Sequence, residues 1–382
     1  MAHHIRLRTA LLFSTLFGLA VGCSGLDDGA DRRAAPPPAG ARRGFTLLAT
    51  GDLLIHASVI RQARADAGGE GYDFRRMLAG DRDLVSRADL ALCHMETITG
   101  RKDGPFSGYP AFKSPPQVSA AARSLGYDSC STASNHTLDD GPEGVGRTLA
   151  AMDGAGLAHA GSARSAAEGR AVTMLRAGGA KVAQLAYTYG TNGIPVPDGK
   201  RWLVNLIDPA RIVEDARAAR RAGAEVVVVS LHWGTEWQQA PDDLQRSVAR
   251  ELTASTAGGR KDIDLIIGTH AHIPQAYEKV NGTWVVYGLG DQIAGVMPDP
   301  RGQMGSAARF TFAPPTAAGR SWTVARAEYI PQIVANDPIG VVNLPRALRE
   351  DPDNARYREA LRTIKDAVLS RGAAKDGLIM GG

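Results

Sequence analysis

Short apolar runs alternate with amphipathic stretches from Phe45 onward. Runs such as FTLLATGD, ADLALCHME, AEVVVVSLHWG and IDLIIGTHAH have the length and composition of buried strands. Amphipathic stretches such as PPQVSAAARSLG and DPARIVEDARAARRAG predict helices, and Asp208 followed by Pro209 marks the start of the second. Hairpins are predicted around Gly178-Gly179 and Asn281-Gly282. The pattern indicates an α/β domain with a mixed sheet system.

Polar residues gather at one kind of place, the C-terminal ends of the predicted strands. This group comprises Asp52, Glu96, Asn135, His136, His232, His270 and His272. In α/β folds, ligands bind outside the carboxyl ends of the strands. We therefore expect these side chains, although distant in the chain, to meet at one site.

The residue types in this group suit a site for two divalent metal ions. Such a site uses a bridging carboxylate, neutral imidazoles and a neutral oxygen donor, and oxygen and imidazole ligands without thiolate suit Zn, Mn, Fe or Mg. Each residue alone also has an ordinary explanation: Asp52 fits a turn, and His232 fits a hydrogen-bonded core histidine. Together they predict a metal or catalytic site. His56 joins the predicted ligands because it follows Asp52 by four residues.

Two further histidines, His94 and His159, are expected to be structural, although His94 precedes Glu96 by two residues. Two cysteines, Cys93 and Cys130, lie in apolar runs of the body. Export would permit a disulfide between them, but we expect buried free thiols.

Composition indicates a globular protein and argues against nucleic-acid binding. Hydrophobic residues make up 44% and charged residues 22% of 382 residues, as in a soluble globular protein. The net charge of +4 is small, and no stripe of aromatic and basic residues accompanies it. The composition therefore gives no indication of nucleic-acid binding.

The N-terminus has the pattern of a bacterial lipoprotein signal over residues 1–23. Basic HHIRLR precedes apolar TALLFSTLFGLAVG, and the small residues AVG stand directly before Cys23. Lipidation of Cys23 would anchor an exported protein to the outer face of the cell membrane. An uncleaved anchor and an ordinary secretory signal are the alternatives. Residues 24–43, rich in Gly, Ala, Pro and charge, predict a flexible tether.

The motifs GDLLIH, HMETITG, SNHTLDDG, SLHWGTEW, IIGTHAHIPQ and YGLGD resemble those of the bacterial capsule-synthesis (poly-γ-glutamate) CapA family. The resemblance covers roughly Phe45 to Ala294. It implies a four-layer sandwich of two mixed β-sheets flanked by helices, the calcineurin-like metallophosphoesterase architecture. It places the metallophosphatase-like domain in residues 44–335 and leaves residues 336–382 as a C-terminal helical extension.

The resemblance also implies roles for single residues. Glu96 takes the place of the bridging carboxylate, and His136 that of the acid or transition-state stabiliser. The expected ligands of two divalent ions (Zn, Mn or Fe) are Asp52, His56, Glu96, Asn135, His232, His270 and His272, with Asp139 and Asp291 beside them. Two positions depart from the family: Met95 replaces asparagine before the glutamate, and Asp291 replaces asparagine after Gly290.

Three functions remain open from the sequence. The first is a membrane-tethered, two-metal hydrolase of the cell envelope acting on a phosphoester or a polymer amide. The second is a non-catalytic accessory protein that binds an anionic polymer beside a membrane synthase. The third is a structural metal site in an envelope protein of unrelated purpose. Fold alone does not decide among them.

Overall fold

Two mixed β-sheets lie face to face in the computed structural model, which describes residues 42–317 and 321–382. The first sheet has the order β16-β15-β14-β1-β2-β3-β4, with β13 paired to β1 and β17 to β15. Its strands are β1 (Phe45–Leu53), β2 (Leu90–His94), β3 (Ser129–Ser131), β4 (Ala158–Ala160), β13 (Asp291–Ile293), β14 (Met304–Ala313), β15 (Thr323–Asn336), β16 (Ile339–Asn343) and β17 (Leu378–Met380).

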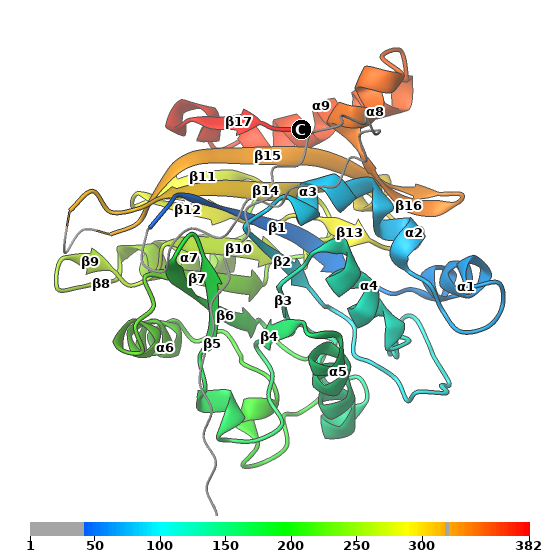
Figure 1. Cartoon of the computed structure of the whole chain (residues 1–382), viewed down its shortest axis with the longest axis horizontal. Coiled ribbons are helices and arrows are strands. Elements are labelled where there is room, and N and C mark those ends of the chain that lie inside the picture. The colour runs from blue at the N-terminus through cyan, green and yellow to red at the C-terminus, as the bar shows by residue number, and fades with distance from the viewer. Residues whose placement is uncertain (1–41, 318–320) are drawn as a thin grey trace, which may run out of the picture. The chain divides into compact units, whose positions relative to one another are not determined.

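The second sheet has the order β11-β12-β10-β7-β6-β5. Its strands are β5 (Thr173–Ala177), β6 (Ala180–Thr188), β7 (Val226–His232), β10 (Leu265–Thr269), β11 (Tyr277–Val280) and β12 (Thr283–Val286). A small separate ribbon joins β8 (Thr256–Ala257) and β9 (Arg260–Lys261). The predicted site residues end or follow β1, β2 and β3 of the first sheet and β7 and β10 of the second. In each sheet these strands run parallel, so their C-terminal ends meet at one edge (Figure 1).

The two-residue period of each strand assigns its side chains to two different cores. Phe45 and Leu47 of β1 face the second sheet, while Leu48, the next residue, faces the helices. In β7, Val228 lies in the core between the sheets and Val227 lies in the outer core. Strands buried on both faces read as continuous apolar runs, which is why AEVVVVSLHWG was recognisable in the sequence.

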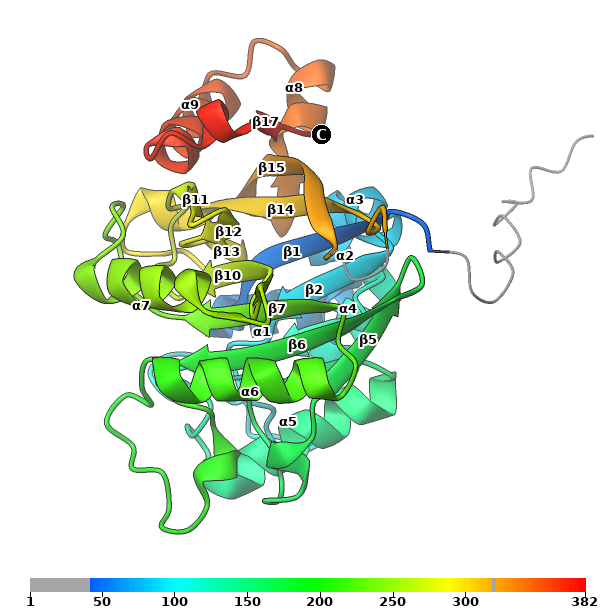
Figure 2. The ribbon, with the colours of Figure 1, turned by 90° about the vertical axis from the view of Figure 1, so that its left-hand side faces the viewer.

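Helices cover both outer faces. Against the first sheet pack α1 (Ala57–Asp66), α2 (Arg75–Leu78), α3 (Arg82–Ser86), α4 (Gln117–Leu125) and, at the β4 end, α5 (Gly141–Ala155). Against the second pack α6 (Pro209–Arg221), which runs along β6 in Figure 2, and α7 (Asp243–Ala254). The predicted architecture of two mixed sheets between helical layers is confirmed.

The C-terminal segment differs from the expected helical extension. It contains α8 (Leu344–Glu350) and α9 (Ala355–Leu369), but β16 and β17 on either side of them pair with β15 of the first sheet. Ile364 and Val368 of α9 join the core that includes β14 and β15. Residues 336–382 therefore combine two helices with two strands of the first sheet.

The expectation of free thiols is wrong. Cys93 of β2 and Cys130 of β3 lie directly opposite each other in parallel register, with Cα atoms 4.3 Å apart, and form a disulfide. Local composition did not reveal this pairing, because it depends on which strands are neighbours.

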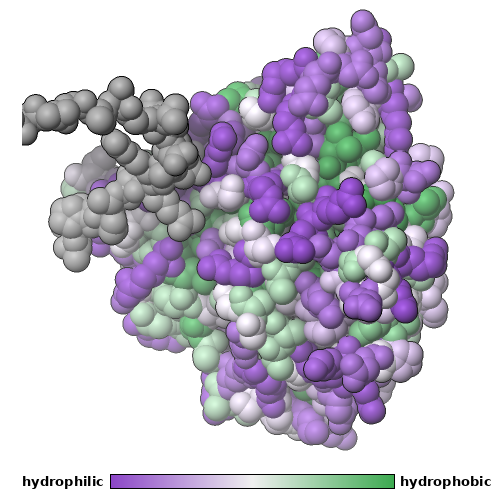
Figure 3. All heavy atoms as spheres, turned by 45° about the vertical axis from the view of Figure 1, so that its right-hand side comes forward, coloured by the Kyte–Doolittle hydropathy of each residue, from purple (hydrophilic) through white to green (hydrophobic). Residues whose placement is uncertain are grey.

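The expected signal peptide and Cys23 lie outside the described residues. Within residues 42–317 and 321–382, no helix has both the length and the apolar character needed to cross a membrane. On the face of the molecule in Figure 3, hydrophilic side chains are interspersed with apolar ones.

Candidate metal centre

Strand pairing places polar residues of both sheets close to Asp52. In the first sheet Asp52 of β1 lies opposite His94 of β2 on one side and Asp291 of β13 on the other. In the second sheet His232 of β7 lies opposite Thr269 of β10, directly before His270. The centre therefore sits where the strand ends of both sheets converge.

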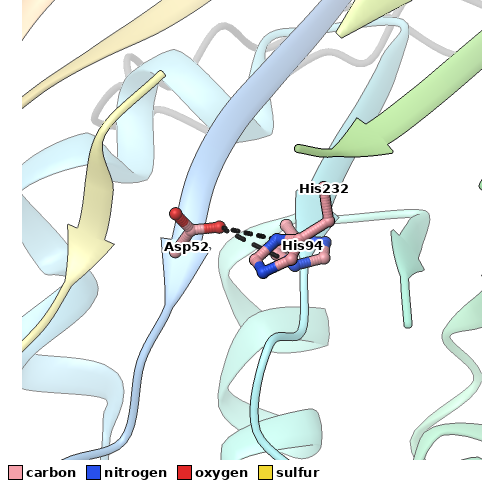
Figure 4. Close-up of side chains that lie close together, drawn as sticks. All are labelled: Asp52, His94 and His232. Carbon is pink, nitrogen blue, oxygen red and sulfur yellow. Dashed lines mark ion pairs between the residues drawn. The ribbon is translucent and has the colours of Figure 1, made fainter. Parts of the chain in front are cut away.

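Asp52, His94 and His232 form the first potential metal-binding group (Figure 4). Asp52 Oδ1 lies 3.7 Å from His94 Nε2 and 4.0 Å from His232 Nδ1. The His94 ring stacks on that of His232 with centroids 4.7 Å apart, and its Nδ1 lies 2.7 Å from Ser131 Oγ. We expected His94 to be structural, but this position adds it to the candidate ligands.

Glu96 occupies the middle of the histidine cluster. Its Oε1 lies 3.9 Å from His232 Nε2 and 3.8 Å from His272 Nε2. Together with Asp52, His272 and Asp291 it forms a second, fully buried group of potential ligands. A carboxylate between two imidazoles from different parts of the chain has the placement that a bridging ligand requires.

Asn135 supplies the neutral oxygen donor predicted from the sequence. Its Oδ1 lies 2.8 Å from His232 Nε2, and its Nδ2 donates a hydrogen bond of 3.1 Å to Asn192 Oδ1. The second contact fixes the orientation of the amide. Its oxygen therefore points to the same nitrogen that faces Glu96.

His270 and His272 have strained backbones, with φ values of 92° and 56° in the left-handed region. Local contacts hold this conformation: the His270 N–H donates to Asp52 Oδ2 at 3.2 Å, and His272 Nδ1 lies 2.9 Å from Asp291 Oδ1. The exposed Glu236 forms a third group with these two histidines. Sequence reasoning missed Glu236, because it lies in a loop without a strand-end signal.

Several buried polar atoms of the centre have no hydrogen-bond partner among the described residues. They are Asp52 Oδ1, His94 Nε2, Glu96 Oε1, Glu96 Oε2, His270 Nδ1 and Asp291 Oδ2. Unpaired buried carboxylates are strongly unfavourable, and divalent cations satisfy them. The residues present therefore fit divalent metal ions.

The electrostatics of the centre agree with this fit. Burial raises the pKa of Asp52 to about 8 and the pKa of Glu96 well above its usual value, and neighbouring carboxylates raise both further. Burial lowers the pKa values of His232 and His270 well below normal, so both stay neutral, as metal ligation requires. Burial also lowers the pKa of His272, but the carboxylates of Asp291, Glu96 and Asp52 outweigh it and raise that pKa.

His136 and His56 lie beside the centre and outside its three ligand groups. His136 Nδ1 lies 2.8 Å from Asp139 Oδ2, which also accepts the Phe112 N–H at 2.7 Å, so Asp139 orients the imidazole. His56 Nδ1 accepts the Gly295 N–H at 3.1 Å, and burial lowers the pKa of His56 to about 4. The three groups found among the described residues do not include His56, and its role as a ligand stays a prediction.

Comparison with known proteins identifies relatives. A family model described as "Bacterial capsule synthesis protein PGA_cap" matches residues 46–296. A "Probable polyglutamine synthesis accessory protein" of Mycobacterium tuberculosis is 28% identical over 219 residues, 54% of this chain and 55% of that protein. The "PGA biosynthesis protein CapA" of Bacillus subtilis is 28% identical over 171 residues, 44% of this chain and 43% of that protein. The matched part spans about half the length of these curated relatives.

Among solved structures, the calcineurin-like phosphoesterase YfkN of Bacillus subtilis has a TM-score of 0.44 and 18% identity, covering 85% of this chain and 99% of that chain. A 5'-nucleotidase precursor of Thermus thermophilus has a TM-score of 0.45 and 16% identity, covering 86% of this chain and 59% of that chain.

Proposed function

We propose that this chain, which belongs to the bacterial capsule synthesis protein PGA_cap family, is a two-metal-dependent hydrolase serving the synthesis or export of a capsule polymer. The observation that carries the proposal is Glu96, a buried carboxylate between His232 and His272 whose two oxygens have no donor within the described ranges. A buried carboxylate without hydrogen-bond donors is unfavourable unless cations bind to it.

In this proposal one ion is held by Asp52, Glu96 and His272, with Asp291 orienting His272. The other is held by Glu96 together with Asn135, His232 and His270. His94 and Glu236 are further candidates for open positions. When bound, the ions supply an acidified water and stabilise negative charge in the transition state.

His136 is the proposed proton donor to the leaving group. Asp139 accepts a hydrogen bond from Nδ1 and would stabilise the imidazolium form, whose Nε2 proton passes to the leaving group. A carboxylate bound to one imidazole nitrogen also fixes the orientation of the ring. This pair acts on the leaving group without being a metal ligand.

The cellular setting is part of the proposal. The lipoprotein pattern that ends at Cys23 motivates an exported protein tethered to the outer face of the cell membrane, next to a membrane synthase. The substrate is then a phosphoester or an amide of an anionic polymer in the envelope. Replacing Cys23 with Ala and following the protein between membrane and soluble fractions tests the anchor.

A second function, that of a non-catalytic polymer-binding accessory protein, is favoured by the mycobacterial relative, which is named a probable polyglutamine synthesis accessory protein. It predicts salt-sensitive binding of a γ-linked glutamyl polymer that survives Asp52→Ala. The hydrolase proposal predicts that productive binding requires the centre.

The decisive test uses residues 40–382, which form one compact unit. The protein is loaded with Mn²⁺ or Zn²⁺ and assayed on a panel of phosphoesters and on a γ-linked glutamyl polymer. We expect metal-dependent turnover, and we expect His136→Ala to lose about 100-fold or more in rate while keeping its metal. A metal-loaded protein that turns over none of these substrates would contradict the proposal.

A further inference from the structure

Two aromatic side chains from separate loops lie against the histidines of the centre. The Tyr189 ring lies on His270 with centroids 4.5 Å apart, and the Trp237 ring lies 5.5 Å from His272. Tyr189 is 41% exposed although its ring packs on a buried histidine. Both aromatic rings therefore line the histidines of the centre, and part of the Tyr189 side chain also faces solvent.

Trp237 adopts a backbone conformation that bulky residues avoid. Its φ is 65°, in the left-handed region, where a non-glycine residue carries strain of about 1–3 kcal/mol. Three features hold it there: its N–H donates to Ala271 O at 3.0 Å, Arg301 donates to its carbonyl at 3.0 Å, and Gly302 leaves room for the indole. A Cβ on Gly302 would lie 2.7 Å from Trp237 Cζ3. The surrounding loops are thus built to keep the indole beside His272.

Trp237 also has apolar neighbours. Trp237 packs against a small cluster that includes Phe112 and Met297. Val296, next to Met297 in the chain, is 71% exposed. Exposed apolar side chains clustered at a polar centre are typical of a ligand-binding surface.

We propose that Trp237 and Tyr189 hold a flat aromatic ring of the substrate, next to the phosphoryl group at the metal centre. This inference rests on the proposed hydrolase function and specifies its substrate class as a phosphoester that carries an aromatic ring. Trp237 and Tyr189 determine specificity through stacking and take no part in proton transfer.

Two non-hydrolysable probes, phenylphosphonate and methylphosphonate, separate ring binding from chemistry. Their dissociation constants are measured by titration calorimetry on Mn²⁺-loaded residues 40–382, with quenching of tryptophan fluorescence as a second readout. We expect phenylphosphonate to bind about tenfold or more tightly than methylphosphonate. Trp237→Ala should abolish the difference, Trp237→Phe should retain most of it, and Tyr189→Ala should reduce it.

Tyr109→Ala is the matched control, since Tyr109 is an exposed aromatic residue near Phe112 rather than against a histidine of the centre. It should leave the ratio unchanged. Thermal unfolding and metal content verify that each variant is folded and loaded. Equal binding of the two probes by the wild type, or an unchanged ratio in folded Trp237→Ala, would overturn the inference while leaving hydrolysis intact. If neither probe binds and no metal is retained, both the inference and the proposed function fail.

Discussion

Two buried carboxylate clusters lie on opposite sides of β13. Asp291 points to the metal centre, whereas the next residue, Gln292, donates a hydrogen bond of 3.0 Å to Asp81 Oδ2. Asn343 Nδ2 lies 3.4 Å from the other oxygen of Asp81. Both oxygens of Asp81 therefore have amide donors, while both oxygens of Glu96 have none among the described residues.

The difference separates a structural carboxylate from a functional one. Burial raises the pKa of Asp81, and the amides of Gln292 and Asn343 partly offset that rise. Burial also raises the pKa of Glu96, and the carboxylates of Asp52 and Asp291 raise it further. Asp81 links β13 and β16 through hydrogen bonds within the protein. The oxygens of Glu96 have no such partner among the described residues, as expected of a ligand for an external cation.

The largest expected effect comes from Glu96→Gln. The change removes the proposed bridging charge, so we expect loss of bound metal and a fall in hydrolytic rate of about 1000-fold. The metal-free variant should unfold at the same temperature as the metal-free wild type or higher, because the amide replaces a buried carboxyl group that has no hydrogen-bond partner among the described residues. Calorimetry of both proteins after chelation checks this. A clear loss of stability in the metal-free variant would mean that Glu96 is structural.

Asp81→Ala should give the reverse pattern. It strands the amides of Gln292 and Asn343, so the free energy of unfolding should fall by about 3 kcal/mol. Metal content should not change. Urea unfolding and elemental analysis of the same preparation measure both, and Asp81→Asn serves as the milder control. Loss of metal in Asp81→Ala at unchanged stability would contradict the distinction between the clusters.

Asp291→Asn tests how much the negative charge of Asp291 contributes to metal binding at the centre. The amide oxygen of asparagine can still accept from His272 Nδ1. We expect metal affinity to fall about tenfold, since the lost charge strengthened His272 as a ligand. Competition with a fluorescent chelator measures the affinity. An unchanged affinity would show that Asp291 acts on something other than His272.

The smallest effect concerns pH. Because the folded metal-free protein holds the pKa of Asp52 at about 8, well above its unfolded value, it binds more protons than the unfolded chain between pH 4 and pH 8. Asp52 therefore contributes stability that falls as the pH rises through this range, by at most about 1.4 kcal/mol per pH unit for each such group. Above about pH 6.5 the histidines with lowered pKa values are neutral in both states and no longer oppose this fall. Metal-loaded protein should show a weaker dependence. Melting curves from pH 5 to pH 8 with and without chelator compare the two.

Local patterns predicted the strands and their polar ends well, because strands buried on both faces have a strong apolar signature. Asp52, Glu96, Asn135, His232, His270 and His272 indeed meet at the same edge of the sandwich. His94 was underestimated although it ends β2, because its closeness to Asp52 follows from the pairing of β1 with β2. A strict strand-end rule would have included it.

Other features depend on long-range neighbours that the sequence does not display. The Cys93–Cys130 disulfide requires β2 and β3 to be adjacent and in register. The inclusion of β16 and β17 in the first sheet requires β15 as a template. Glu236 and Trp237 reach the centre through loop geometry, including a positive φ at Trp237 that no local pattern specifies.

The most direct test of the central claim is metal content, measured by elemental mass spectrometry on residues 40–382. The wild type is compared with Asp81→Asn and with a Glu96→Ala, His272→Ala double variant. The account predicts about two transition-metal ions per chain in the wild type and in Asp81→Asn, and none in the double variant. A wild type without bound metal after reconstitution would contradict it, and the unpaired carboxylates of the centre would need another explanation.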